Sequence, residues 1–189
     1  MGMASLTGRL LVATPALGDR NFDRTVVLLL DHDADGALGV VINRPTQVKV
    51  GDILPPWSTY TSEPGVVFQG GPVSADSALG LASLAGVSRD DNEPLGFRRL
   101  YNGIGLIDLD APPEVLIGEM SSLRIFAGYS GWASEQLESE ISEGAWYVVE
   151  AEPADPFSFR PDQLWREVLR RQGGDLALVA TYPEDPTMN

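Results

Sequence analysis

The sequence predicts an α+β domain, in which helices pack outside a largely antiparallel or mixed sheet. Apolar runs typical of strands dominate the first half of the chain, and helical patterns appear only in the second half. The 20 glycines and 14 prolines are spread along the 189 residues, so they separate short elements and form no low-complexity tract. Because a chain of this length buries roughly 70% of its unfolded surface, we expect residues 1–189 to form one domain, with 183–189 as a loose tail.

The predicted strands begin near the N-terminus. The apolar run Leu10–Thr14 ends at a proline, and the β-branched, leucine-rich run Thr25–Leu30 is typical of a strand buried on both faces. The polar segment 31–36 is a dense turn signal that leads to a second strand at Leu38–Ile42, which together predict a hairpin. Asn43-Arg44-Pro45 ends this hairpin, because proline cannot continue a central ladder.

The middle of the chain continues the strand pattern. We expect an irregular loop at 55–64, a strand at Val66–Gln69, and either a strand or a helix at Ala78–Leu84. A second hairpin over Phe97–Leu109 is predicted to turn at Asn102-Gly103, a preferred two-residue turn.

The second half adds the helices. A proline pair predicts a short helix over Pro112–Met120, because proline suits the first helical turn. A second helix is predicted over Ser134–Glu143, with Ser134 as its N-cap and a glycine as its end, and a third over Pro161–Gly173. Strands are expected beside these helices at 123–129, 146–151 and 176–181.

Composition and charge exclude several functions. The 27 acidic residues outnumber 13 basic ones, which gives a net charge of −14 and makes direct nucleic-acid binding unexpected. The arginines at 98–99 and at 166, 170 and 171 are interpreted as solvated faces. The absence of cysteine excludes disulfides and thiol nucleophiles, and the single histidine, His32, cannot make a histidine-rich metal site, so we predict no cofactor and no metal. With no signal peptide and no run of roughly 20 apolar residues, we expect a cytoplasmic protein without membrane contact.

Two short motifs resemble functional patterns and depart from them. Asp31-x-Asp33-x-Asp35-Gly36 copies half of an EF-hand loop, but Ile42 stands where a carboxylate ligand is required, so a hairpin turn with Asx hydrogen bonds fits better. Gly128-Tyr129-Ser130-Gly131-Trp132 lies between a predicted strand and helix, like a nucleophile elbow, but a tryptophan replaces the last glycine. A triad of Ser130, His32 and an aspartate competes with a tight glycine turn whose aromatic rings plug the core.

Polar side chains on the helix at 134–143 give another candidate. Gln136 and Glu140 fall inside or beside its apolar stripe, whereas Glu138 points away. Because a buried carboxylate needs a donor, we expect Glu140 to contact Trp132, the glycine-loop amides or an arginine. Its role is either that of a brace or that of an acid or base in a cleft.

Two further signals each have a structural and a functional interpretation. Gly70-Gly71-Pro72 follows a strand and could cradle an anion with free amides, although a tight bend is the better interpretation. His32 could be a ligand or a base, and a turn histidine with a satisfied hydrogen bond is the favoured interpretation.

Four stretches, taken together, resemble the AlgH/YqgE family of bacterial proteins. They are residues 8–15 (Gly-Arg-Leu-Leu-Val-Ala-Thr-Pro) with Asp19 and Phe22, residues 32–45, residues 70–73 (Gly-Gly-Pro-Val), and residues 128–132 (Gly-Tyr-Ser-Gly-Trp) with Gln136-Leu137-Glu138, Ile141 and Trp146. The resemblance covers the chain from Ser5 to Tyr182. It implies a strongly bent, split sheet that forms a pseudo-barrel, and a role as a transcriptional regulator, with no catalytic residue or cofactor established.

The resemblance also implies that the motif residues matter together, as a binding or structural cluster. The cluster comprises Asp19, His32, Asn43, Arg44, Gly70, Gly71, Tyr129, Ser130, Trp132, Gln136 and Glu140. One position departs from the family, which usually has glycine where this chain has Glu135. A glycine there could permit an unusual backbone angle or a close approach, and the carboxylate of Glu135 would repel an anion at the start of the helix.

Four functions remain open, and a binding or regulatory module that acts through a protein partner or a small effector is preferred. A direct DNA-binding regulator is disfavoured by the charge and by the lack of a readable helix-turn-helix. The third function is that of a hydrolase-type enzyme, which would use Asp19, His32, Glu140 or Ser130. The fourth is that of a structural protein without a small ligand.

Overall fold

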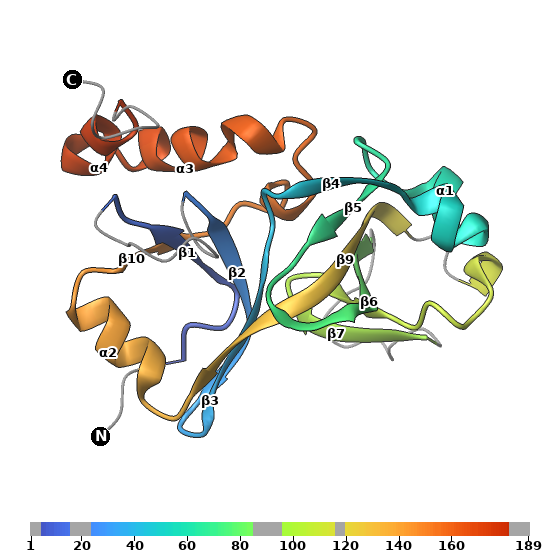
Figure 1. Ribbon diagram of the computed structural model, residues 1–189, viewed down its shortest axis with the longest axis horizontal. Helices are drawn as coiled ribbons and strands as arrows, with labels where there is room; N and C mark the ends of the chain where they lie inside the picture. Colours follow the sequence, from blue (N-terminus) through green and yellow to red (C-terminus); the bar gives the residue numbers. More distant parts are fainter. Residues whose placement is uncertain (1–4, 16–23, 85–95, 116–119, 182–189) are drawn as a thin grey trace.

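The computed structural model describes residues 5–15, 24–84, 96–115 and 120–181 (Figure 1). The strands are β1 (Arg9–Ala13), β2 (Val26–Asp33), β3 (Gly36–Val41), β4 (Pro45–Lys49), β5 (Val66–Gln69), β6 (Val73–Leu84), β7 (Phe97–Tyr101), β8 (Ile104–Ile107), β9 (Met120–Ala133) and β10 (Trp146–Glu150). The α-helices are α1 (Val50–Ile53), α2 (Gln136–Ser142), α3 (Leu164–Gln172) and α4 (Gly174–Val179). Short 3₁₀ turns are η1 (Pro55–Tyr60), η2 (Pro113–Val115), η3 (Asp155–Phe157) and η4 (Pro161–Gln163).

One long, bent strand joins the two parts of the sheet. The strand order is β10-β1-β2-β3-β9-β6-β8-β7, and β4 and β5 attach to β9 as a separate branch. The first part of β9 pairs with β6, while its last residues, Ser130–Ala133, pair with β3. All the strand pairs of the described residues are antiparallel except β5 with β9, which is parallel. The mixed, mostly antiparallel sheet therefore curls into a half-barrel with helices outside it, as predicted.

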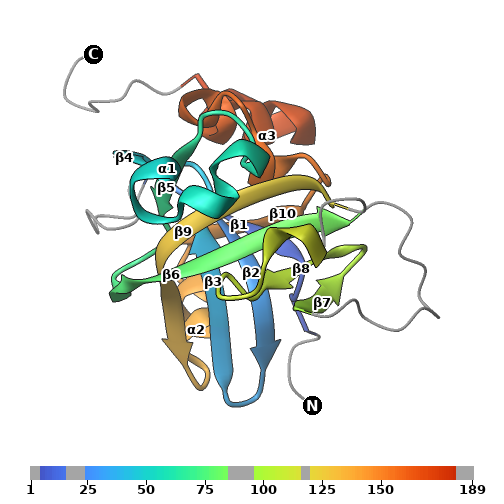
Figure 2. The same cartoon turned by 90° about the vertical axis from the view of Figure 1, so that its right-hand side faces the viewer.

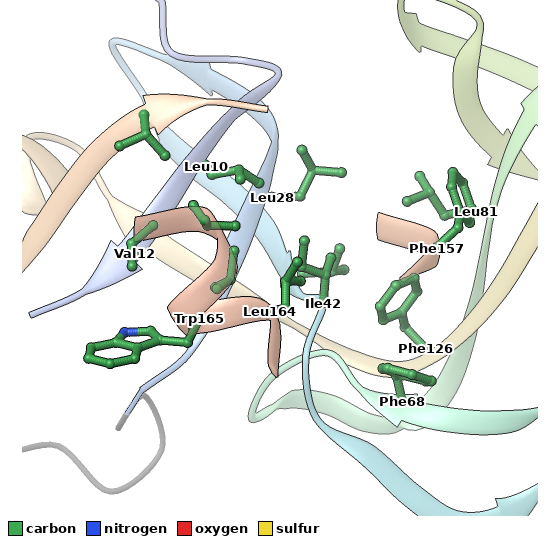
Figure 3. Close-up of a cluster of buried hydrophobic side chains, with 14 of the residues drawn as sticks. Leu10, Val12, Leu28, Ile42, Phe68, Leu81, Phe126, Phe157, Leu164 and Trp165 are labelled. Atoms are coloured by element: carbon green, nitrogen blue, oxygen red, sulfur yellow. The ribbon is translucent and has the colours of Figure 1, made fainter. Parts of the chain in front are cut away.

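Helices cover both faces of the β10-β1-β2-β3 part of the sheet. Alternate residues of β1 divide between two cores: Leu10 and Val12 pack with the apolar face of α3, and Leu11 packs with the side of α2. Figure 1 shows α3 and α2 on opposite sides of these strands, and Figure 3 shows the α3 side of the core around Trp165. This two-sided burial confirms the prediction from the continuous apolar run in β2.

A third apolar cluster lies beneath α1 and η1 in the other part of the sheet. It includes Trp57, which is 1% exposed and donates its indole N–H to the carbonyl of Leu109 at 2.9 Å. The segment expected as an irregular loop at 55–64 thus contains a 3₁₀ turn that anchors an aromatic side chain. Figure 2 shows α1 and η1 beside β9 and β6, the two longest strands.

Several element predictions are confirmed, and three are wrong. Both predicted hairpins are present, as β2–β3 and β7–β8, and Ala78–Leu84 is a strand within β6. The strand predicted at 176–181 is instead helix α4. A short apolar run has no periodicity that distinguishes a strand from a helix. The glycines at 173–174, both with positive φ, turn the chain back so that α4 packs against α3. The helix predicted at 112–120 is only the turn η2 among the described residues, and Met120 already belongs to β9.

The third error concerns the start of α2. Ser134 does not cap the helix, and its hydroxyl donates to the carbonyl of Ala34 at 2.7 Å. Glu135 occupies the N-cap position with φ 64, in the left-handed region. The glycine that the family usually has here therefore corresponds to a positive φ, which this chain imposes on a glutamate.

Replacing Glu135 by glycine should raise the free energy of unfolding by about 1 kcal/mol, because glycine adopts a positive φ without a Cβ clash. Chemical denaturation measures this gain. Glu143→Gly is the matched control, since Glu143 ends the same helix at φ −79 and gains nothing from glycine. Equal effects of the two substitutions would show that the backbone angle of Glu135 costs no stability.

Among the described residues, no helix combines the length and the apolar character needed to cross a bilayer.

Candidate functional site

The predicted motif cluster divides among three places in the fold. Gly70, Gly71, Tyr129 and Ser130 meet where β5 and β6 approach β9; His32, Trp132, Gln136 and Glu140 gather around α2; and Asn43 and Arg44 line a pocket beside α3. Asp19 lies outside the described residues. The first two places hold the fold together, whereas Asn43 and Arg44 line a pocket in which several cationic side chains meet.

The glycine-aromatic motif is part of strand β9, so the predicted turn is wrong, although the rings of Trp132 and Tyr129 pack with the core as expected. Gly128 of this motif and Gly71 allow two backbone segments to lie unusually close: a Cβ on Gly128 would lie 2.5 Å from the carbonyl oxygen of Gly71, and one on Gly71 would lie 2.2 Å from that of Tyr129. Ser130 is fully buried and donates its hydroxyl to the carbonyl of Gly70 at 3.1 Å. The amide of Gly70 already donates to Ala127 at 2.8 Å, which fits the tight bend and leaves that amide unavailable to an anion.

His32 is a buried residue of β2, and both of its ring nitrogens have partners. Nδ1 accepts the backbone N–H of Leu6 at 2.9 Å, so the ring proton lies on Nε2, which contacts Oε1 of Glu138 at 2.6 Å. The Ser130–His32 triad is therefore wrong, because the Ser130 hydroxyl and the imidazole bond to different groups. Glu138, expected to point away, lies on the flank of α2 next to Leu137 and reaches the imidazole.

The hydrogen bond from His32 lowers the pKa of Glu138 below its ordinary value of 4.5. A carboxyl whose pKa is lower in the folded state contributes stability above its unfolded pKa, and this contribution is lost as the pH falls through the folded pKa. Glu138→Gln should therefore show a smaller fall in unfolding free energy than the parent protein between about pH 5 and about pH 3. Urea denaturation at both pH values measures the unfolding free energy of the two proteins. An equal fall in both would refute the coupling between Glu138 and His32.

Glu140 is held by three donors, among them Trp132 as expected. Its Oε1 accepts the indole N–H groups of Trp132 at 3.2 Å and of Trp146 at 3.0 Å, and its Oε2 accepts from Gln136 at 2.9 Å. The two indole rings meet edge to face, with centroids 6.2 Å apart. A carboxylate with this many donors is arranged as a brace between α2, β9 and β10.

The acidic run at 31–36 forms the turn between β2 and β3. The amide of Asp35 donates to the Asp33 carboxylate at 2.8 Å, which is the expected Asx hydrogen bond. Within the ranges that the structure describes, no group of three or more histidine, aspartate or glutamate side chains is placed to hold a metal ion.

The third place, which we call the arginine pocket, lies where the β2–β3 hairpin meets the start of α3. It is lined by Arg24, Asn43, Arg44, Pro161, Asp162, Trp165 and Arg166, and its volume is about 190 Å³. Three of the chain's twelve arginines thus converge in a molecule of net charge −14. Asp162 is the one carboxylate among the lining residues, so the described wall of the pocket carries a net positive charge.

Asn43 builds the hairpin side of the arginine pocket. Its Oδ1 accepts the N–H of Val26 at 3.0 Å, and its Nδ2 donates to the carbonyl of Arg24 at 3.0 Å. This clamp joins the start of β2 to the end of β3 and holds Arg24 at φ 51. Asn43 is therefore a positioning residue that fixes where the two hairpin arginines lie.

Trp165 builds the helix side of the arginine pocket. The guanidinium of Arg24 lies over its ring at 4.6 Å, that of Arg166 lies 5.8 Å from the ring centroid, and its indole N–H donates to Ala13 at 2.9 Å. Arg166 also donates to the carbonyl of Ala180, at the end of α4. The pocket therefore connects the sheet to the C-terminal helix pair.

Sequence reasoning found Asn43 and Arg44 and missed Arg24, Trp165 and Arg166. Arg24 can be placed only once the hairpin register is known, because extending the pairing Val27↔Val41 by three residues puts Arg24 opposite Arg44. The other arginines assigned to a solvated face behave differently: Arg171 makes a bidentate ion pair with the buried Asp155, at 2.7 and 2.8 Å, which raises the pKa of Arg171.

Comparisons with known proteins agree with this fold. A family model described as AlgH-like matches residues 10–177. A UPF0301 protein of Streptomyces coelicolor is 65% identical over 99% of this chain and 97% of its own length, and one of Thermobifida fusca is 48% identical over 100% and 98%. A crystal structure of a Corynebacterium diphtheriae protein superposes with a TM-score of 0.86 at 32% identity, over 96% of this chain and 94% of that one. The solution structure of the AlgH protein from Pseudomonas aeruginosa superposes with a TM-score of 0.67 at 26% identity, over 97% of both chains.

Proposed function

The chain belongs to the AlgH-like family, and we propose that it works as a regulatory binding module that takes a small anionic effector in its arginine pocket. The observation that carries this proposal is the convergence of Arg24, Arg44 and Arg166 on one hollow of an otherwise acidic molecule. Guanidinium groups are the side chains best suited to bind carboxylate or phosphate, because each offers several donors in a fixed fork.

The location of the arginine pocket supports a regulatory role more than a catalytic one. The ligand would touch the β2–β3 hairpin and α3 together, so it would link the sheet to the C-terminal helices. Any part in transcriptional regulation would then be indirect, through a protein partner that distinguishes the loaded form. Direct nucleic-acid contact stays disfavoured by the net charge of −14, and the cytoplasmic location stays a prediction.

Replacing Arg44 by alanine should weaken binding of a small anion at least tenfold, because a charge-assisted hydrogen-bond donor of the pocket is lost. Isothermal titration calorimetry with a panel of phosphates and carboxylates at constant ionic strength measures this effect. Arg98→Ala removes an exposed arginine of β7 and serves as the control for the change in net charge. Binding that is lost equally in both variants, or that is unaffected in both, would contradict the proposed site.

A further inference from the structure

We infer that the chemical group held in the arginine pocket is a phosphoryl group, such as the terminal phosphate of a small monoester, rather than a carboxylate or a nucleobase. This inference rests on the proposed function, because it specifies the ligand of the same pocket. It follows from the three segments that supply the arginines, from the occupied ring of Trp165 and from the pocket volume.

The three arginines approach the arginine pocket from three separate segments. Arg24 precedes β2, Arg44 follows β3, and Arg166 lies on α3. A carboxylate presents two oxygens in one plane, which one guanidinium fork satisfies. A phosphoryl group presents three terminal oxygens in tetrahedral directions, so it can accept donors from three segments at once.

The ring of Trp165 is not available for stacking. Trp165 is 4% exposed, and the guanidinium groups of Arg24 and Arg166 lie near its ring. A base or another aromatic group of a ligand therefore finds no stacking surface on this indole. Trp165 instead contacts the two cations of the pocket wall and holds them in place, as a positioning residue.

The volume of the arginine pocket suits a small charged group. About 190 Å³ far exceeds the roughly 10–15 Å³ that one water molecule requires. It is smaller than the roughly 300–1,000 Å³ typical of pockets that enclose a drug-sized ligand. A phosphoryl group with a short organic substituent fits these limits, whereas a whole nucleotide would have to extend outside.

Asp162 carries the opposite charge to the three arginines and therefore supplies a distinctive test. Its carboxylate lines the arginine pocket and accepts a hydrogen bond from Gln163 at 3.3 Å. A carboxylate close to a bound anion repels it, so Asp162→Asn should tighten phosphoryl binding, by roughly threefold for charges about 6 Å apart in water. A gain in affinity cannot arise from a variant that merely destabilises the fold.

The test is a calorimetric titration of the full chain with inorganic phosphate, glycerol 3-phosphate, acetate and malonate at constant ionic strength. We expect the two phosphates to bind at least tenfold more tightly than malonate, which carries a similar charge on planar groups. Arg44→Lys should weaken phosphate binding about tenfold, because a point charge replaces a fork, and Asp162→Asn should strengthen it.

The outcomes separate the two proposals. Malonate binding as tightly as phosphate, with Arg44→Ala abolishing both, would overturn the phosphoryl inference and leave the anion site intact. Tight binding of adenosine, which has no phosphate, would also overturn it. If no anion binds, or if Arg44→Ala and Asp162→Asn leave binding unchanged, both the inference and the proposed function fail.

Discussion

Replacing Gly71 by alanine is expected to lower the free energy of unfolding by about 3 kcal/mol or more, or to prevent folding. The added Cβ would lie 2.2 Å from the carbonyl oxygen of Tyr129, 2.3 Å from its carbonyl carbon and 2.5 Å from Oγ of Ser130. Two of these atoms belong to the backbone of β9, so no change of rotamer relieves the clash. The strand that joins the two parts of the sheet would have to move away from the Gly70-Gly71 bend.

Gly131→Ala is the matched control for this substitution. Gly131 belongs to the same motif in β9, but the nearest atom to its added Cβ, on the Tyr129 ring, is 3.9 Å away. Its substitution should therefore leave the thermal midpoint nearly unchanged. Thermal and urea unfolding of both variants measure the difference, and two variants of equal stability would refute the close-contact account of the motif.

Replacing Arg124 by alanine is expected to cost about 3–5 kcal/mol of unfolding free energy, because a large buried side chain and its hydrogen bonds are both lost. Arg124 is 1% exposed, and its guanidinium donates to the carbonyls of Pro156 at 3.2 Å, Ser158 at 2.8 Å and Glu63 at 2.7 Å. It also lies over the ring of Phe68 at 4.2 Å. Among the described residues, no carboxylate forms an ion pair with it.

Burial lowers the pKa of Arg124 to about 10, so the guanidinium still carries its charge at neutral pH. Carbonyl oxygens from the loop at 61–65 and from the segment around η3 therefore stabilise this charge. Chemical denaturation compares Arg124→Ala with Arg98→Ala, which removes an exposed arginine and should change stability by less than about 0.5 kcal/mol. A loss below about 1 kcal/mol for Arg124→Ala would show that the three carbonyls do not depend on the guanidinium.

The local parts of the fold were predictable from the sequence. The β2–β3 hairpin follows from two apolar runs separated by a polar turn, and α3 follows from an apolar face that begins at a proline and ends at a glycine. These signals lie within a few residues of the elements that they specify. The bent sheet is different, because it depends on which part of β9 pairs with β3 and which with β6, and only the family resemblance anticipated it.

The errors arise where distant segments decide the structure. The glycines of residues 128–132 suggest a turn when considered alone, but Gly128 serves the close approach of Gly70-Gly71 to β9. Arg44 was identified from its motif, whereas Trp165 lies more than a hundred residues away and gives no local sign that its ring carries two guanidinium groups. Glu135 is the opposite case, since the departure from the family's glycine pointed directly to an unusual backbone angle.

The most direct test of the arginine pocket is a phosphate titration followed by the indole N–H resonances of the four tryptophans in ¹H–¹⁵N correlation spectra. Trp165 lies in the pocket wall, whereas Trp57, Trp132 and Trp146 lie in other clusters. Binding in the pocket predicts a saturable shift of the Trp165 resonance in the parent protein, lost in Arg44→Ala, with the other three unchanged. A Trp165 resonance that does not move at saturating phosphate, or equal shifts of all four, would contradict a phosphoryl site between the hairpin and α3.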